Sequence, residues 1–158
     1  MIPHLPLELN TNPDLPKVLF DTNVILDILL AREPYAICSR KVVACMYTLD
    51  AKSFVAASAI TDLYYLLRKQ LGNPASARDA LEEVLRLFEV ADTTGIDIHN
   101  AHAVKNADFE DAVVAAVAAR MGLQYLITRN TKDFKDLPVR AVTPSEFLKL
   151  MNEEVAEE

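Results

Sequence analysis

Apolar and polar positions along the chain fall into two alternating patterns. Short apolar runs, each about as long as a buried strand, predict five strands, at residues 17–21, 53–57, 90–93, 124–128 and 139–142. Apolar residues at helical spacing predict seven helices, at residues 23–30, 35–52, 59–71, 75–88, 96–106, 108–121 and 144–152. Strands that alternate with helices favour a mostly parallel central sheet with helices on both faces, which is a three-layer α/β/α fold.

The pattern assigns one domain to residues 17–152, since 158 residues are enough for one sizeable core. Residues 1–16 carry four of the eight prolines and little periodicity, so we expect an extended lead-in. Residues 153–158 form a short acidic tail that we expect to be frayed. Ser58 is expected to cap the helix that follows it, and Gly72 to end that helix.

Composition and charge narrow the range of functions. Hydrophobic residues make up 51% of the chain, charged residues 25%, and the net charge is −7. This charge argues against a general nucleic-acid coat protein, but bound cations reverse the local field, so an enzyme acting on nucleic acid is not excluded. Because no apolar run approaches about 18 residues and no signal peptide is evident, we expect a cytoplasmic protein without a membrane span.

Glycine, cysteine and histidine exclude several kinds of site. The three glycines lie far apart, which excludes the glycine-rich loops that bind phosphates and dinucleotides. Cys38 and Cys45 stand seven apart on one predicted helix face, too far along the helix for a disulfide, and we expect buried, reduced thiols. His99 and His102 stand three apart, but a zinc site needs a third ligand, so surface or packing roles are expected.

Polar side chains follow three of the predicted strands at the point where each strand ends. Asp21 ends the first strand, Asp62 opens the helix after the second, and Asn130 and Asp133 follow the fourth. Because parallel strands bring their carboxyl ends to the same edge of a sheet, we expect these residues to share one site.

Asp108 and Asp111 add two more acids in the helix before the fourth strand. Their spacing of three places both on one face of its first turn. Two carboxylates about 4 Å apart repel by roughly 4 kcal/mol at an effective dielectric near 20. A divalent cation removes that repulsion, and Mg²⁺ and Mn²⁺ take oxygen ligands of this kind. The acids therefore predict a metal site, whose natural task is phosphoryl chemistry.

Several of the acids also have an ordinary structural explanation. Asp62 and Asp108 stand where helix caps and first-turn acids are common, and Asp133 can simply orient its loop. Asp21 and Asp111 are harder to explain in this way, since neither a strand end nor a buried helix needs an acid there.

The residues around Asp21 leave more than one interpretation open. Thr22 and Asn23 can cap the helix that follows them, hold Asp21 in place, or do both. Asp27 is expected on a solvated helix face. None of these roles depends on a metal.

Four segments of the chain resemble the motifs of PIN-domain ribonucleases, in particular the VapC-type toxins of bacterial and archaeal toxin–antitoxin pairs. The segments are residues 19–27 (LFDTNVILD), 59–67 (AITDLYYLL), 108–116 (DFEDAVVAA) and 125–134 (YLITRNTKDF). They occur in the right order and cover most of the domain. The resemblance implies a PIN-like fold and a Mg²⁺- or Mn²⁺-dependent endoribonuclease.

The resemblance also assigns roles to individual residues. It implies that Asp21 and Asp111 are the principal metal ligands and that Asp62 assists them. Asp62 stands where the family usually has glutamate, and Asn130 stands where many members have a fourth acid, which Asp133 can replace. The polar residues that would support the site are Thr22, Asn23 and Thr128.

RNA is the substrate that the resemblance implies, and an antitoxin protein is the implied partner. Arg129 and Lys132 are candidates for contact with RNA phosphates, and unpaired RNA is the expected target because its backbone is accessible. A homodimer is also expected, in which two copies share the apolar face of the helix at 35–52 or at 75–88.

Two other functions stay open. A PIN-like module with a weakened metal site would bind RNA or a protein without cutting, which the residues at 62 and 130 favour. A phosphatase or a phospho-accepting receiver would also carry an acid near a strand end. Haloacid-dehalogenase-type phosphatases want a second Asp where Asn23 stands, and receivers place the acceptor Asp later in the chain.

Overall fold

An all-parallel sheet of five strands forms the centre of the structure, a computed structural model that describes residues 15–156 and the side chains of residues 15–152. The predicted lead-in at residues 1–16 therefore lies almost wholly outside the described residues. The strands are β1 (Lys17–Phe20), β2 (Lys52–Ala56), β3 (Glu89–Ala91), β4 (Tyr125–Ile127) and β5 (Ala141–Val142). Their spatial order is β3-β2-β1-β4-β5, so the first strand of the chain lies in the middle.

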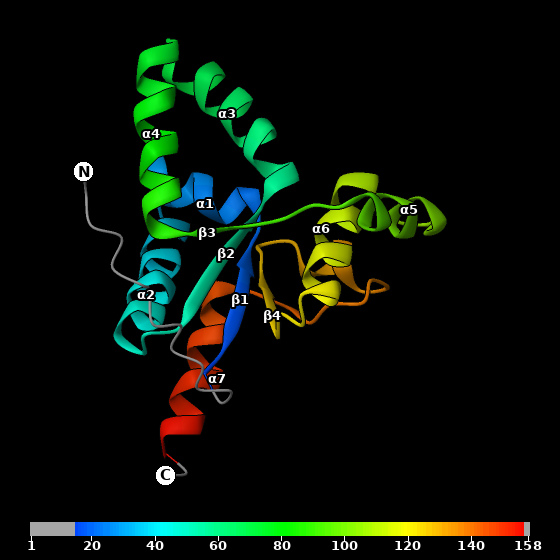
Figure 1. Cartoon of the computed structure of the whole chain (residues 1–158). Coiled ribbons are helices and arrows are strands. Elements are labelled where there is room, and N and C mark those ends of the chain that lie inside the picture. Colours follow the sequence, from blue (N-terminus) through cyan, green and yellow to red (C-terminus); the bar gives the residue numbers. More distant parts are fainter. Residues whose placement is uncertain (1–14, 157–158) are drawn as a thin grey trace, which may run out of the picture.

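Seven α-helices and one 3₁₀ helix complete the described part of the chain. They are α1 (Thr22–Leu29), α2 (Tyr35–Thr48), α3 (Ala57–Leu71), α4 (Pro74–Leu87), α5 (Gly95–Ala103), α6 (Phe109–Arg120), η1 (Thr131–Phe134) and α7 (Pro144–Ala156). The chain steps from β1 to β3 in one direction and then returns past β1 to β4. Since parallel crossovers are right-handed, this reversal moves α5 and α6 to the face opposite α1, α2 and α4 (Figure 1).

Most of the central strand and most of α6 are deeply buried. Val18, Leu19 and Phe20 of β1 are at most 1% exposed, because sheet neighbours and helices cover them on every side. Residues 112–118 of α6 are all buried alanines and valines, whose small side chains let the helix lie close to its neighbours. The acids at the start of α6 are therefore carried on a rigid support.

The α/β/α fold is confirmed, and the sheet is parallel throughout. The predicted cap at Ser58 is wrong, because α3 begins one residue earlier, at Ala57, without any side-chain cap. The Ser58 N–H instead donates to the Thr93 hydroxyl at 3.1 Å, which comes from the loop after β3. The end of the helix at Gly72 is confirmed, since Gly72 has a left-handed backbone (φ 77°) and its N–H donates to the Arg68 carbonyl.

Three further expectations can be compared with the structure. Both cysteines are free, but they are half-buried rather than buried. His99 and His102 are exposed, as expected. The last helix runs on to Ala156, into the segment predicted as a frayed tail. Within residues 15–156, no helix is both long and apolar enough to cross a membrane.

Candidate active site and metal centre

Asp21 follows β1 directly and caps α1. Its Oδ1 accepts a hydrogen bond from the Thr22 N–H at 2.8 Å. Its Oδ2 accepts two more, from the Asn23 side-chain amide at 3.0 Å and from the Thr128 hydroxyl at 2.8 Å. Three donors thus fix the orientation of the carboxylate. Since a carboxylate has about four acceptor positions, one on Oδ1 is left for a further ligand.

The structure decides between the roles open to Thr22 and Asn23. Neither caps α1, because Asp21 is the N-cap and they are the first two helical residues. Asn23 holds Asp21 through its side-chain amide, and Thr22 does so through its backbone N–H.

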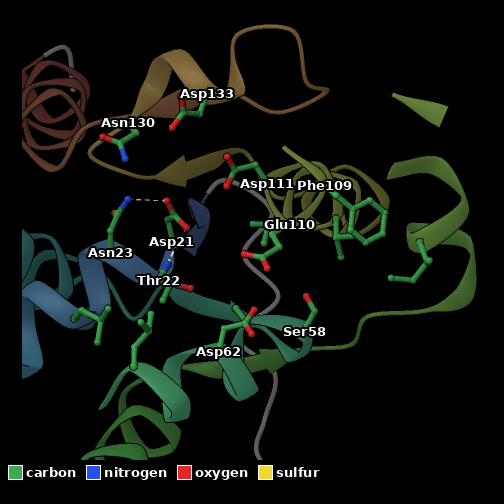
Figure 2. A pocket seen from close by; sticks show the side chains of 16 residues that line it. Asp21, Thr22, Asn23, Ser58, Asp62, Phe109, Glu110, Asp111, Asn130 and Asp133 are labelled. Atoms are coloured by element: carbon green, nitrogen blue, oxygen red, sulfur yellow. Dashed lines mark hydrogen bonds between the residues drawn. The ribbon is translucent and has the colours of Figure 1, made fainter. Parts of the chain in front are cut away.

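A cavity of about 370 Å³ lies beyond the carboxyl ends of β1, β2 and β4. Seven predicted site residues line it, namely the metal-ligand candidates Asp21, Asp62, Asp111, Asn130 and Asp133 and the supporting residues Thr22 and Asn23 (Figure 2). Apolar side chains form much of the remaining wall, among them Leu26, Leu66, Val113 and Val114. The parallel sheet therefore brings these residues together.

Asp111 shows how strongly the acids in this region affect one another. It lies in the first turn of α6, and its pKa is raised from 3.8 to about 6. Burial is the largest cause, and the negative charges that add to it belong to Asp21, Asp108, Asp133 and Glu110. Burial also raises the pKa of Asp21, against the hydrogen bonds from Thr128 and Thr22. Positive charge in this cavity would therefore be favourable.

Asp62 is exposed and lies across the cavity from Asp21 and Asp111 (Figure 2). The prediction that it opens α3 is wrong, because the helix begins at Ala57 and Asp62 is its sixth residue. A helix cap therefore cannot explain this acid.

Asp108 has the structural role that caps commonly have. It is the N-cap of α6, and its Oδ1 accepts from the Glu110 N–H at 3.0 Å and from the Asp111 N–H at 3.3 Å. It does not line the first cavity. It lines a neighbouring one of about 390 Å³, which shares Asp111 and Asp133 with the first and also contains Lys132. A metal role for Asp108 stays a prediction.

The loop after β4 is tied to Asp21 through Thr128. Thr128 is fully buried, and its hydroxyl both donates to Asp21 and accepts from the Asn130 N–H at 3.1 Å. The Asp133 N–H then donates to the Asn130 carbonyl at 3.1 Å and begins the turn of η1. These bonds fix the backbone that carries Asn130 and Asp133 into the cavity.

Arg129 and Asp27 occupy positions that the sequence did not suggest. Asp27 is 0% exposed, so the prediction of a solvated helix face is wrong. Arg129 Nε lies 2.9 Å from Asp27 Oδ2, and its guanidinium carbon lies 4.3 Å from the centre of the Tyr35 ring. The guanidinium is therefore already engaged within the protein. Its predicted contact with RNA has not been tested.

Glu110 was not predicted as a site residue, yet it also lines the cavity.

The spacing of Asn23 and Asp27 could have linked Asp27 to the site. The two residues stand four apart, which is the spacing of one helix face.

The donor set fits a hard divalent cation. Within residues 15–152, no three His, Cys, Asp or Glu side chains lie close enough together to form a ready-made metal site. Mg²⁺ does not require such a cage, because it commonly binds through one or two carboxylates and keeps several waters. The open acceptor position on Asp21 Oδ1 and the carboxylate of Asp111, which lines the same cavity, satisfy that lesser requirement.

Comparisons with solved structures show what this fold is similar to. The DNA-bound VapBC complex from Salmonella typhimurium contains a chain with a TM-score of 0.64 and 18% identity; the match covers 82% of this chain and 99% of that one. VapBC2 from Rickettsia felis, bound to a fragment of its promoter DNA, contains a chain with a TM-score of 0.63 and 14% identity. This match covers 80% of this chain and 97% of that one. VapC20 from Mycobacterium tuberculosis, described as a toxin that cleaves the Sarcin-Ricin loop, matches with a TM-score of 0.55 and 16% identity. This match covers 69% of this chain and 86% of that one.

At these identities the likeness shows the fold alone. Among curated proteins, no match was found. The family model of the PIN domain matches residues 17–132, which is well over half of the chain. The chain therefore belongs to the PIN domain family.

Proposed function

We propose that this protein is a Mg²⁺- or Mn²⁺-dependent endoribonuclease that hydrolyses phosphodiester bonds in RNA. One observation carries the proposal: acids from separate elements line one cavity, and the pKa of Asp111 is raised in part by their negative charges. Such an arrangement costs stability unless it serves to bind a cation. The PIN fold, which is that of a nuclease family, supports the same conclusion.

Asp21 and Asp111 are the residues that we expect to hold the metal, with oxygen from Asn130 and water completing the ligands. A bound divalent ion would polarise the phosphodiester and lower the pKa of a water molecule. Asp21 is suited to this role because three hydrogen bonds hold its carboxylate in place before anything binds.

The remaining acids serve the site from further away. Asp62 and Asp133 line the cavity and are exposed, so we expect them to bind the metal through water. Lys132 is exposed beside Asp133 in the neighbouring cavity and is our candidate for contact with an RNA phosphate. Without a cation, the acids would repel RNA, so binding of RNA should depend on metal.

The direct test is cleavage of a single-stranded RNA with and without Mn²⁺. We expect cleavage with Mn²⁺, none with a chelator, and a loss of at least about a hundredfold in Asp21→Asn and in Asp111→Asn. Asp79→Asn is the matched control, because Asp79 is an exposed acid on α4 that lines neither cavity. Full activity of Asp21→Asn would overturn the proposal.

We propose further that the enzyme is the toxin of a type II toxin–antitoxin pair. The three solved structures above support this proposal, since two are toxin–antitoxin complexes and one is a toxin. Expression of the wild-type chain should then arrest bacterial growth, and expression of Asp21→Asn should not. A protein encoded beside it should bind the chain and relieve the arrest. Equal growth with both chains would contradict the toxin role.

A PIN module that binds RNA or protein without cutting is the second candidate. It is favoured because, among the side chains of residues 15–152, no three His, Cys, Asp or Glu lie close enough together to hold a metal ion. Calorimetric titration with Mn²⁺ separates the two functions. Heat of binding that Asp21→Asn abolishes supports the nuclease, and no binding at millimolar Mn²⁺ supports the inert module.

A further inference from the structure

Arg129, in the loop after β4, contacts two helices. Its backbone N–H donates to Asn23 Oδ1 at 3.4 Å. Its side chain reaches past that contact to Asp27, with Nε 2.9 Å from Oδ2. Its guanidinium also stacks on Tyr35, at the start of α2. One residue of the loop after β4 thus meets both α1 and α2.

The two contacts with α1 are related by the geometry of the helix. Asn23 and Asp27 are four residues apart, so they lie one above the other on one face. Attachment at two points one turn apart fixes both the position and the rotation of the loop against α1. A single contact would fix only its position.

The same loop and helix supply the two side-chain donors to Asp21 Oδ2. Thr128, the neighbour of Arg129, donates its hydroxyl to Asp21 Oδ2, and Asn23 donates its amide to the same atom. The Asn23 side chain therefore accepts from Arg129 with its oxygen and donates to Asp21 with its nitrogen. A displacement of Arg129 along α1 would therefore change how both donors lie relative to Asp21 Oδ2.

Buried Asp27 depends on nearby positive charge, chiefly that of Arg129 and then that of Arg32. The carboxylate is fully buried, and neither of its oxygens accepts a hydrogen bond from the described residues. Arg129 Nε stands at ion-pair distance without the angle of a hydrogen bond. The contact is therefore mainly electrostatic, and the Tyr35 ring, on which the planar guanidinium stacks, helps to orient it.

We propose that Asp27, Arg129 and Tyr35, which we call the Arg129 clamp, position Asp21 for metal binding by holding the Thr128 loop against α1. None of the three lines the cavity, so they act as positioning residues. The metal-binding part of this inference rests on the proposed function, and the positional part does not.

A second ion pair in the same fold provides a matched control. Asp97 is also 0% exposed, and Arg120 Nε lies 2.9 Å from its Oδ1. The side chains of Arg120 and Arg129 are similarly exposed, at 33% and 30%. The Asp97–Arg120 pair joins α5 to the end of α6, and neither residue lines the acidic cavity or contacts Asp21. Loss of this ion pair should therefore lower the stability of the fold and leave the position of Asp21 unchanged.

The first measurement is the Kd for Mn²⁺, by calorimetry, of the wild type, Arg129→Met and Arg120→Met, each shown to be folded by circular dichroism. We expect Arg129→Met to bind Mn²⁺ about tenfold more weakly and Arg120→Met to bind as the wild type does. Tyr35→Leu, a milder change at an exposed residue, should weaken binding in the same direction by less. Unchanged affinity in Arg129→Met, or equal weakening in Arg120→Met, would overturn the clamp.

The second measurement needs no metal. In ¹H–¹⁵N spectra, the assigned side-chain NH₂ group of Asn23 reports the bond to Asp21. We expect its signals to shift in Arg129→Met and Tyr35→Leu and to stay in place in Arg120→Met. Unmoved signals in the first two variants refute the clamp even if the protein binds no Mn²⁺. If the wild type binds no Mn²⁺ but the Asn23 signals still shift in Arg129→Met and Tyr35→Leu, the positional role is upheld and the proposed function is refuted.

Discussion

Asp21 and Asp111 both have raised pKa values, but their carboxylates differ in the groups that surround them. Three hydrogen-bond donors stabilise the carboxylate of Asp21. Asp111 is surrounded by negative charge, which together with burial raises its pKa to about 6. Hydrogen bonds thus hold the carboxylate of Asp21 in place, whereas the charged form of Asp111 is unfavourable. A bound cation would stabilise the charged form of Asp111.

Removing the charge of Asp111 should therefore stabilise the metal-free protein. The raised pKa of Asp111 means that its charged form is unfavourable in the folded protein by about 3 kcal/mol at most. Partial access of solvent reduces this energy. We therefore expect Asp111→Asn to raise the free energy of unfolding by about 1 kcal/mol at pH 7.5. Urea denaturation in a chelator measures it. In millimolar Mn²⁺ the order should reverse, since only the wild type gains from binding. A less stable metal-free variant would contradict this account.

Asn130→Asp is the complementary change, because it adds an acid to the same cavity. The extra charge should lower the stability of the metal-free protein by about 1 kcal/mol and tighten Mn²⁺ binding. Thermal unfolding with and without Mn²⁺ shows both effects in one experiment. If the added acid left the Mn²⁺-dependent rise in Tm unchanged, Asn130 would have no place among the ligands.

At the scale of elements, the joint between α5 and α6 depends on Asp97. This carboxylate accepts from Arg120 and from the Thr94 N–H at 2.8 Å, within a capping box at the start of α5. Burial by itself would raise the pKa of Asp97, but these hydrogen bonds together outweigh it and lower the pKa. The bonds therefore stabilise the charged form in the folded state only.

The sign of the pH dependence follows from that lowered pKa. As the pH falls below about 4, the unfolded chain binds a proton at Asp97 before the folded protein does, so stability is lost. Above that pH the contribution is complete. We expect Asp97→Asn to cost about 3 kcal/mol at pH 7 and clearly less at pH 3. Urea denaturation of both proteins across this range measures the difference, and a constant difference would contradict the assignment.

Element boundaries and buried partners were the features that sequence patterns predicted least well. The run of small residues at 56–59 gives no periodicity that separates the end of β2 from the start of α3, so Ser58 looked like a cap. Asp27 looked solvated because a single acid on a short helix usually is, and its partner Arg129 lies about a hundred residues away. Local spacing carries no information about such a pair.

At the scale of the whole molecule, the parallel arrangement of the strands was the informative inference. Alternating strands and helices predicted the parallel sheet, and the parallel sheet predicted that Asp21, Asp62, Asn130 and Asp133 would meet at one edge. The structure places all four on one cavity. The order of elements along the chain did not reveal that α6, which carries Asp111, lies on the face of the sheet opposite α1. Its position depends on the return of the chain from β3 to β4.

Exposed apolar side chains on α2 and α4 favour the homodimer, which stays a prediction. On α2, Tyr47 is 88% and Ile37 51% exposed, and on α4 Leu85 is 52% exposed. Burying such side chains between two copies would remove apolar surface from water. We expect light scattering at about 100 μM protein to give twice the mass of one chain. The mass of a single chain at that concentration would exclude the dimer.

The central claim is that the acids around Asp21 form a metal-dependent ribonuclease site. The most direct measurement is the rate of cleavage of a single-stranded RNA in Mn²⁺ by the wild type and by Asp21→Asn, prepared identically. We predict cleavage by the wild type that a chelator stops, and almost none by Asp21→Asn. Equal cleavage by both proteins, or cleavage that continues in the chelator, would contradict the claim.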